Sequence, residues 1–288
     1  MKKIFKSIYN SIPLKKNLFK IIRLFKIPKS IYQHLHFQDV FKVKLDDSYF
    51  IIKHHGYKIE NEIFWSGLTN GWEKISMQVW IELCKEATTI IDIGANTGIY
   101  SLVAKTLNPE ANVFGFEPVK RVYKKFQNNC TLNNYDIKCL EYAASNFDGE
   151  ALIYDTPAEH IYSVAVNKNL TPDSITIETK IKTKKLATFI KENNISSIEL
   201  IKIDVETHEP EVLEGMEGYL MKFQPTLLIE ILNDDVGQKV QMLIKDIDYL
   251  YFNIDEVNRP KRVDRIIKSD YYNYLICKKE IAKKMNLI

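Results

Sequence analysis

The stretch Thr89-Ile90-Ile91-Asp92-Ile93-Gly94-Ala95-Asn96-Thr97-Gly98-Ile99-Tyr100 decides the fold of this 288-residue chain. It opens with an apolar β-branched run, which is typical of a strand buried on both faces of a parallel sheet. A tight turn with two glycines follows and leads into a helix whose apolar residues recur at helical spacing. A strand, a glycine-rich turn and a helix N-terminus form a cradle for a polar ligand, because backbone N–H groups point outward and glycine permits close approach.

The turn differs from a dinucleotide-binding turn at two positions. A G-x-G-x-x-G fingerprint would place glycines where the chain has Asn96 and Ile99. The strand ends in Asp92, which would repel a pyrophosphate but attract a ligand with an amino group and a sulfonium. The pattern D-x-G-A-N-x-G resembles the first motif of class I S-adenosylmethionine (SAM) methyltransferases, with a sheet turn carrying incidental glycines as the alternative. The cofactor-binding residues that this resemblance implies are Asp92, Gly94, Ala95, Asn96 and Gly98.

Length and composition are those of an ordinary globular protein. The chain can bury one large core or two small ones, with 45% hydrophobic and 27% charged residues. The four cysteines form no C-x-x-C pair, which favours reduced thiols and a cytoplasmic location. No run of eighteen apolar residues predicts a membrane span, and lysines interrupt every N-terminal apolar run, so we expect no signal peptide.

Charge is distributed unevenly along the chain. The net charge is +3, and residues 1–38 hold nine Lys/Arg without any acid, so the remainder carries −6. This mildly acidic body predicts no nucleic-acid partner.

In the basic arm, residues 2–34 predict two short amphipathic helices separated by Pro13 and closed by Pro28. Such an arm can lie peripherally on the inner face of an anionic membrane, pack on the body, or form a solvated leader. Apolar residues of the second helix are Leu18, Ile21, Ile22 and Phe25.

The rest of the chain alternates between strands and helices. A β-ribbon is expected over residues 39–63 and a short helix at Met77–Cys84. Residues 150–182 interrupt the alternation with two β-like segments around an irregular loop that contains His160, Tyr162 and Ser163. Further expected strands are Ala111–Phe116, Ile137–Ala144, Ile198–Val205, Thr226–Ile231 and a closing pair at Tyr249–Ile254 and Tyr272–Lys278, around a solvated loop at Asn258–Ser269. Further expected helices are Val119–Leu132, Leu186–Asn193, Glu211–Met221 and Val240–Ile247.

This order of elements predicts an α/β fold. We expect a Rossmann-like, doubly wound, mostly parallel seven-stranded sheet with an antiparallel C-terminal edge strand, plus the N-terminal helical arm and the small β-ribbon. The expected domains are 1–38 for the basic arm, 39–85 for the ribbon and the helix that leads into the core, and 86–288 for the methyltransferase domain. Ligands of such sheets bind at the carboxyl ends of the central strands, so polar residues there are the candidates for a site.

Glu117 ends the second strand of this sheet, 25 positions after Asp92. A carboxylate at about this distance can accept hydrogen bonds from both hydroxyls of a ribose, and a solvated strand-end acid is the alternative. The third strand ends in Ala143-Ala144-Ser145. Small residues such as Ala144 leave room for an adenine ring, although they also suit tight packing.

Three charged residues alternate with apolar ones in the fourth strand. Lys202, Asp204 and Glu206 therefore share one face of a buried strand, which requires that they pair or meet a ligand. A structural ion pair between Lys202 and Asp204 is the alternative to a functional role. His208 begins the next helix, where a packing or helix-start role is the alternative to catalysis.

Four stretches together resemble the FkbM family of SAM-dependent methyltransferases. They are IIDIGANTGIYS, VFGFEP, IKIDVETHEPEVLEGM and LLIEI, within residues 72–232. Glu73 and Ser163 also lie near positions that the family tends to keep polar. The third stretch usually reads K-x-D-V-E-G-x-E in the family, and here Thr207 replaces the glycine. Where the family usually has an Asp before the 186–193 helix, this chain has none, and the resemblance does not cover residues 1–38.

Transfer of a methyl group to a hydroxyl requires alignment of donor and acceptor and removal of the hydroxyl proton. The candidates for the base or the acceptor-orienting group are Asp204, Glu206 and His208. An Asp is a weak base unless burial raises its pKa, so Asp204 can orient the acceptor while His208 takes the proton. A magnesium ion held by Asp204, Glu206 and Glu230 is the metal-assisted alternative, but no tight ligand loop is present and no His/Cys spacing predicts zinc.

The leading hypothesis is a SAM-dependent O-methyltransferase. The family resemblance implies an acceptor hydroxyl on a sugar, a glycan, a glycolipid or a secondary metabolite, and it leaves both the acceptor and the oligomeric state open. A SAM-binding sensor or scaffold without turnover is the second hypothesis. An NAD(P) oxidoreductase is the third, and Asn96 and Ile99 argue against it.

Overall fold

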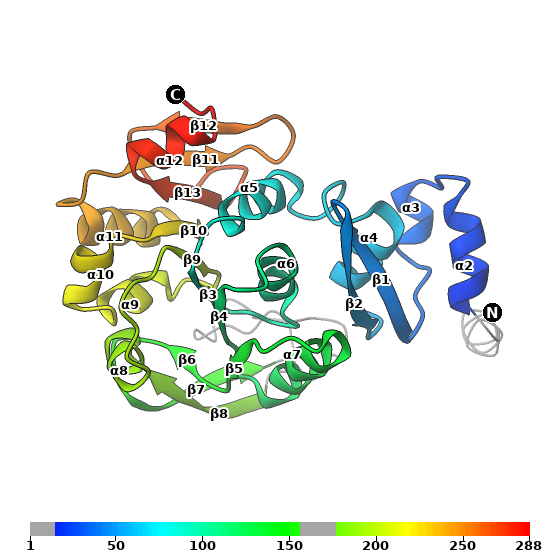
Figure 1. Ribbon diagram of the computed structural model, residues 1–288, viewed down its shortest axis with the longest axis horizontal. Coiled ribbons are helices and arrows are strands. Elements are labelled where there is room, and N and C mark those ends of the chain that lie inside the picture. Colours follow the sequence, from blue (N-terminus) through cyan, green and yellow to red (C-terminus); the bar gives the residue numbers. More distant parts are fainter. Residues whose placement is uncertain (1–14, 156–176) are drawn as a thin grey trace.

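The computed structural model describes residues 15–155 and 177–288. Eight strands form the central sheet in the order β12-β11-β13-β10-β9-β3-β4-β5 (Figure 1). The strands are β3 (Thr89–Ile93), β4 (Asn112–Phe116), β5 (Lys138–Leu140), β9 (Leu200–Ile203), β10 (Thr226–Glu230), β11 (Leu250–Ile254), β12 (Pro260–Val263) and β13 (Asn273–Cys277). All pairings from β5 to β10 are parallel, which confirms the predicted mostly parallel sheet.

The antiparallel part of the sheet differs from the prediction. The C-terminal strand β13 is antiparallel to both β10 and β11, so it lies between them rather than at the edge. The edge strand is β12, which pairs antiparallel with β11 and raises the number of strands from seven to eight. Its residues lie in the segment predicted to be a solvated loop. Its exposed Lys261 and Arg262 explain the error, because edge strands are commonly charged and lack the apolar pattern of a buried strand.

Helices cover both faces of the sheet, as the doubly wound prediction requires. Successive residues of β3 point to opposite faces, so Ile90 joins one core cluster and Ile91 the other. Beside Ile90 lie α5 (Lys74–Cys84), α6 (Ile99–Leu107), α7 (Lys120–Asn133) and α12 (Lys279–Lys284). Beside Ile91 lie α8 (Leu186–Glu192), α9 (Glu209–Glu214), α10 (Gly218–Phe223) and α11 (Asp234–Ile244). The helix predicted over Glu211–Met221 is thus two short helices.

A second, three-stranded sheet has the order β6-β8-β7. It consists of β6 (Ala143–Ala144), β7 (Gly149–Asp155) and β8 (Ile177–Lys184). The strand predicted over Ile137–Ala144 is therefore divided: β5 pairs with β4, and β6 pairs with β8. The predicted loop with His160, Tyr162 and Ser163 lies outside the described residues.

The N-terminal unit packs against the same core. Its elements are α2 (Lys15–Arg23), α3 (Lys29–Tyr32), β1 (Asp39–Leu45), β2 (Ser48–His54) and α4 (Lys58–Ser66). The predicted ribbon is the antiparallel pair β1–β2, whereas α4 occupies the end of the predicted ribbon region. Phe19, Trp65 and Trp80 belong to one continuous buried cluster that extends to the central sheet. Within the described residues, no helix is long and apolar enough to cross a membrane.

Candidate active site

A cavity of about 470 Å³ opens at the carboxyl ends of the central parallel strands. The turn after β3, the end of β4, the segment after β9 and the end of β10 all contribute to its wall. This is the place where the predicted site residues were expected to meet. Those that line the cavity are Asp92, Gly94, Ala95, Asn96, Glu117, Ala144, Asp204, Glu206 and His208. Gly98 is not part of the lining, although its neighbours Thr97 and Ile99 are.

The two glycines of the turn serve its packing. Gly94 has a φ of 78°, and a Cβ there would lie 1.8 Å from the backbone oxygen of Asp204. Gly98 has a φ of 85°, and a Cβ there would lie 2.1 Å from the ring of Phe126. Both positions therefore require glycine because protein atoms occupy the space, rather than to leave room for a ligand. The consequence for the site is that the end of β9 lies directly against the turn.

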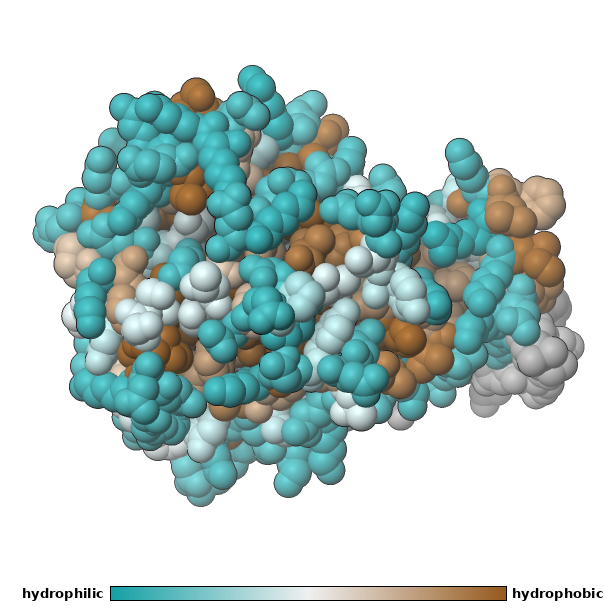
Figure 2. All heavy atoms as spheres, viewed as in Figure 1, coloured by the Kyte–Doolittle hydropathy of each residue, from teal (hydrophilic) through white to brown (hydrophobic). Residues whose placement is uncertain are grey.

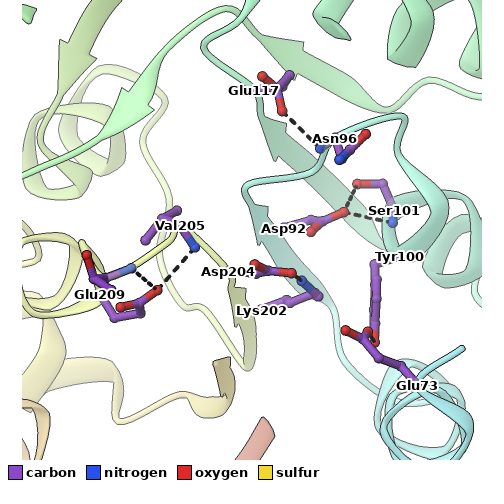
Figure 3. A network of polar contacts seen from close by, with 11 residues as sticks. Glu73, Asp92, Asn96, Tyr100, Ser101, Glu117, Lys202, Asp204, Val205 and Glu209 are labelled. Carbon is purple, nitrogen blue, oxygen red and sulfur yellow. Dashed lines mark hydrogen bonds and ion pairs between the residues drawn. The ribbon is translucent and has the colours of Figure 1, made fainter. Parts of the chain in front are cut away.

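Asp92 is buried at the end of β3 and is half satisfied (Figure 3). Its Oδ2 accepts hydrogen bonds from the backbone N of Ser101 at 3.0 Å and from the Ser101 hydroxyl at 2.7 Å. Its Oδ1 has no hydrogen-bond partner among the described residues. Burial raises the pKa of Asp92, against the opposing effect of the Lys202 ammonium. A buried carboxylate oxygen in a cavity wall can accept a hydrogen bond from a ligand or attract its positive charge.

Glu117 is held by the backbone on both sides of its carboxylate. Its Oε2 accepts a hydrogen bond from the backbone N of Asn96 at 3.1 Å, and its Oε1 accepts one from the N of Val119 at 2.8 Å. Asn96 adopts a left-handed φ of 53°, and its buried Oδ1 has no hydrogen-bond partner in the described part of the chain. Because each carboxylate oxygen has a second lone pair, Glu117 can still accept from a ligand while its position is fixed.

Lys202 in β9 and Asp204 just after it form an ion pair, which was expected from the sequence as the structural alternative to a functional role. Lys202 Nζ lies 2.8 Å from Asp204 Oδ2 and 4.5 Å from the centre of the Tyr100 ring. Burial alone would lower the pKa of Lys202, but the carboxylates of Asp204, Glu73 and Asp92 outweigh it and raise that pKa. Lys202 therefore stays charged and keeps Asp204 in place at the cavity wall.

Glu73 is a site residue whose position in the cavity was not predicted. It precedes α5, adopts a left-handed φ of 43°, and accepts a 2.5 Å hydrogen bond from the Tyr100 hydroxyl. Burial raises the pKa of Glu73 to about 7. The sequence held only one signal for it, the resemblance to a family that keeps a polar residue nearby. A buried acid in a strained backbone conformation is a feature of functional sites.

Glu230 at the end of β10 completes the acidic part of the wall. Burial, with the nearby carboxylates of Asp204 and Glu206, raises the pKa of Glu230 to about 10, so it is protonated at neutral pH. No group of three or more His, Cys, Asp or Glu side chains within the described ranges is arranged to hold a metal ion. Asp204, Glu206 and Glu230 thus share a wall without forming such a group.

The turn after Glu206 carries backbone strain. Glu206 and Thr207 have φ values of 55° and 81°, which a β-branched residue such as Thr207 rarely adopts. Glu209 steadies the turn, since its Oε1 accepts hydrogen bonds from the backbone N of Val205 and of Thr207, each at 3.2 Å. His208 follows, with Nε2 at 3.0 Å from the Ser145 hydroxyl, and burial lowers the pKa of its imidazole.

The lining of the cavity is strongly acidic. It carries seven carboxyl groups and two lysines, and the carboxyl groups other than Glu230 and Glu73 still outnumber the lysines, so it favours a cationic ligand over a pyrophosphate. The carboxyl groups are those of Glu62, Glu73, Asp92, Glu117, Asp204, Glu206 and Glu230, and the lysines are Lys58 and Lys202.

Comparison with known proteins identifies the family of this chain. Residues 92–264, more than half of the chain, match the family described as Methyltransferase FkbM domain. Methyltransferase 1 of Beauveria bassiana is 24% identical over 212 residues, which cover 66% of this chain and 81% of that protein. The hexuronic acid methyltransferase AglP of Haloferax volcanii is 28% identical over 148 residues, 51% of this chain and 58% of that protein. A solved methyltransferase FkbM from Methylobacillus flagellatus aligns with a TM-score of 0.41 and 16% identity, covering 66% of this chain and 43% of that one. The chain belongs to the FkbM methyltransferase family.

Proposed function

We propose that this protein is a SAM-dependent O-methyltransferase that acts on a hydroxyl of a sugar, glycan, glycolipid or secondary metabolite. One observation carries the proposal: a single cavity joins the backbone-held acids Asp92 and Glu117 to the ion pair of Asp204 and the buried Glu73. Membership of the FkbM family supports methyl transfer, and the name of the hexuronic acid methyltransferase among the relatives supports a sugar acceptor.

The residues of the β3 and β4 turns fit SAM. When bound, SAM supplies a methyl group that its positively charged sulfur activates for transfer. The acidic lining suits that charge. Oδ1 of Asp92 and Oδ1 of Asn96, which have no hydrogen-bond partner among the residues that the structure describes, can accept hydrogen bonds from polar groups of the cofactor. Glu117 is positioned to accept from the ribose hydroxyls, and the small Ala144 leaves space for the adenine ring.

Asp204 and Glu73 have different roles in this proposal. Asp204 is fixed by its 2.8 Å ion pair with Lys202, and its carboxyl oxygens can accept a hydrogen bond from the acceptor hydroxyl and orient it. Glu73, with a pKa of about 7, is suited to take the hydroxyl proton at neutral pH. The reaction balances as one new O–C bond, one broken C–S bond and one proton moved from the hydroxyl to Glu73. His208 keeps its imidazole neutral and supports the wall through Ser145.

A cytoplasmic location is part of the proposal. All four cysteines are free thiols, which is the usual state in a reducing compartment. The mildly acidic body favours a small-molecule or glycan acceptor over a nucleic acid, and the hexuronic acid methyltransferase among the relatives is named for a sugar substrate.

Methyl-labelled SAM and a panel of candidate acceptors, including glycans that contain uronic acids, provide the test. We expect SAM to bind in calorimetry and the label to appear in at least one acceptor as a base-stable methyl ether. SAM binding without transfer to any acceptor would favour the sensor or scaffold hypothesis, and the absence of SAM binding would contradict the proposal.

A further inference from the structure

The helix α2 packs on the body with only one of its two apolar faces. Phe19 is 3% exposed, with its ring centre 5.5 Å from that of Trp65 in α4 and 6.3 Å from that of Phe37. Ile22, one turn later on the same side, also packs against the core. This face accounts for the attachment of α2 to the N-terminal unit.

The opposite face of α2 and the turn that follows it are apolar and exposed. Ile21, Leu24 and Phe25 are 59%, 79% and 77% exposed, and Leu18 lies one turn before Ile21. Figure 2 shows hydrophobic side chains gathered at the end of the molecule that carries α2. We call Leu18, Ile21, Leu24 and Phe25 the docking face. A cluster of large exposed apolar side chains marks an interaction surface.

The surroundings of the docking face are basic. Residues 15–34 contain six Lys/Arg and no acid, and Lys20 and Lys26 are exposed beside the apolar residues. Two other lysines of this segment form ion pairs with residues of β1 and α4: Lys16 with Asp39 at 2.9 Å, and Lys29 with Glu62 at 2.6 Å. The charge of this end of the protein therefore stays positive on its outer side.

We propose that the docking face binds a lipid surface with anionic headgroups, its apolar side chains entering the headgroup region while Lys20 and Lys26 contact the anions. An exposed apolar stripe flanked by lysines is what such a surface attracts. A second copy of the chain fits less well, because pairing two docking faces would bring their lysines together.

The docking face and the cavity belong to one packed unit. Trp65, which contacts Phe19, and Glu62, which pairs with Lys29, both lie in α4. Glu62 also lines the cavity, together with Lys58 and Ile59. The element that carries the docking face is thus attached directly to a wall of the site, whereas the match to the FkbM family model begins only at residue 92.

Co-sedimentation of the full chain with vesicles tests the proposal without SAM or acceptor, so its result is independent of the proposed methyl transfer. One vesicle is phosphatidylcholine alone, and the other contains about a third phosphatidylglycerol. The test variant is Leu24→Ser/Phe25→Ser. The matched control is Met242→Ser/Val257→Ser, two side chains that are 70% and 67% exposed elsewhere on the body.

We expect the wild type and the control to bind the anionic vesicles, and the test variant to lose about tenfold or more of its partitioning. Binding to neutral vesicles should be weaker than to anionic ones. Equal partitioning of the test variant and the control would overturn the proposal. The proposal would also be overturned if the wild type did not bind vesicles and instead formed a dimer that the test variant could not form.

Discussion

The two sides of the cavity satisfy their carboxylates in different ways (Figure 3). On the side of β3 and β4, Asp92 and Glu117 accept hydrogen bonds from backbone N–H groups, which hold each side chain in one place. On the side of β9 and α5, side chains take that place: Asp204 pairs with Lys202, and Glu73 accepts a hydrogen bond from the Tyr100 hydroxyl. Burial raises the pKa of Asp92 as well as that of Glu73, so the two sides differ in their partners rather than in their burial. The first arrangement suits a fixed binding cradle, and the second suits groups that change their charge or exchange a proton. The proposed division of labour between cofactor and acceptor follows from this difference.

The largest expected effect is on catalysis, from Glu73→Gln. We expect the rate of methyl transfer to fall by roughly 10²- to 10⁴-fold because the hydroxyl proton loses its acceptor. In the wild type the rate should rise with pH through about 7, as Glu73 loses its proton, and the variant should lack this rise. A pH–rate profile measures both, with His208→Gln as the comparison variant. A rise near pH 7 that survives in Glu73→Gln but disappears in His208→Gln would assign the proton to His208.

The same substitution has a stability signature. The pKa of Glu73 in the folded protein is about 7, above its ordinary value of 4.5, so the folded state binds the extra proton between these values. Stability from this group is present below pH 4.5 and is lost as the pH rises through 7. The free energy of unfolding of Glu73→Gln should therefore fall less over this window than that of the wild type. Parallel curves in denaturant titrations at several pH values would mean that Glu73 is not protonated in the folded state.

A second large effect separates the two sides of the cavity. Asp204→Asn removes the charge that orients the acceptor, and we expect a loss of about 10²-fold in transfer, with SAM affinity changed by less than about threefold. The measurement pairs label transfer with calorimetry of SAM. Asp246→Asn, at an exposed position, is the matched control. An equal loss of SAM affinity and transfer in Asp204→Asn would show that the two sides do not act separately.

Glu117→Ala changes the side of the cavity that is proposed to bind SAM. It removes the acceptor of two backbone hydrogen bonds and the group proposed to hold the ribose, so we expect SAM affinity to fall by about 1.5–3 kcal/mol, or roughly 10- to 100-fold. The transfer rate at saturating SAM should change much less. Calorimetry of SAM measures the loss, with the exposed Glu110→Ala as its control. Unchanged affinity in Glu117→Ala would remove Glu117 from the binding site.

The smallest expected effect concerns the turn after Glu206. Thr207→Gly should relieve a φ of 81° and stabilise the protein by about 1 kcal/mol, since glycine adopts this conformation without strain. Thr131→Gly, within the helix α7, should instead destabilise it by a few tenths of a kcal/mol. Thermal unfolding distinguishes the two. A loss of stability in Thr207→Gly as large as in the control would show that Thr207 contributes a contact that outweighs the strain.

The sequence predicted the parts of the molecule that depend on local patterns. Short apolar runs identified the parallel strands, and the polar residues at their ends identified most of the cavity wall, because parallel strands bring their carboxyl ends to one edge. The edge strand β12 was missed because its charged residues resemble a loop. The helix α4 was missed because it buries Glu60, Asn61 and Glu62, which hide the apolar period of a helix.

The parts of the site that the sequence did not predict depend on contacts between distant segments. Glu73 acquires its character from Tyr100, from Lys202 and from a left-handed backbone, none of which a local pattern contains. The need for glycine at position 94 comes from the backbone of Asp204, more than a hundred residues later. The exposed side of α2 also depends on distant contacts. Phe19 and Ile22 pack against the core, and this packing turns Leu24 and Phe25 outward.

Titration of SAM into the wild type, Glu117→Ala and Asp204→Asn by calorimetry tests most directly whether one side of the cavity binds the cofactor and the other serves the acceptor. We predict that the wild type binds SAM, that Glu117→Ala binds it roughly 10- to 100-fold more weakly, and that Asp204→Asn binds it as the wild type does. A wild type that does not bind SAM, or an equal loss of affinity in both variants, would contradict this division.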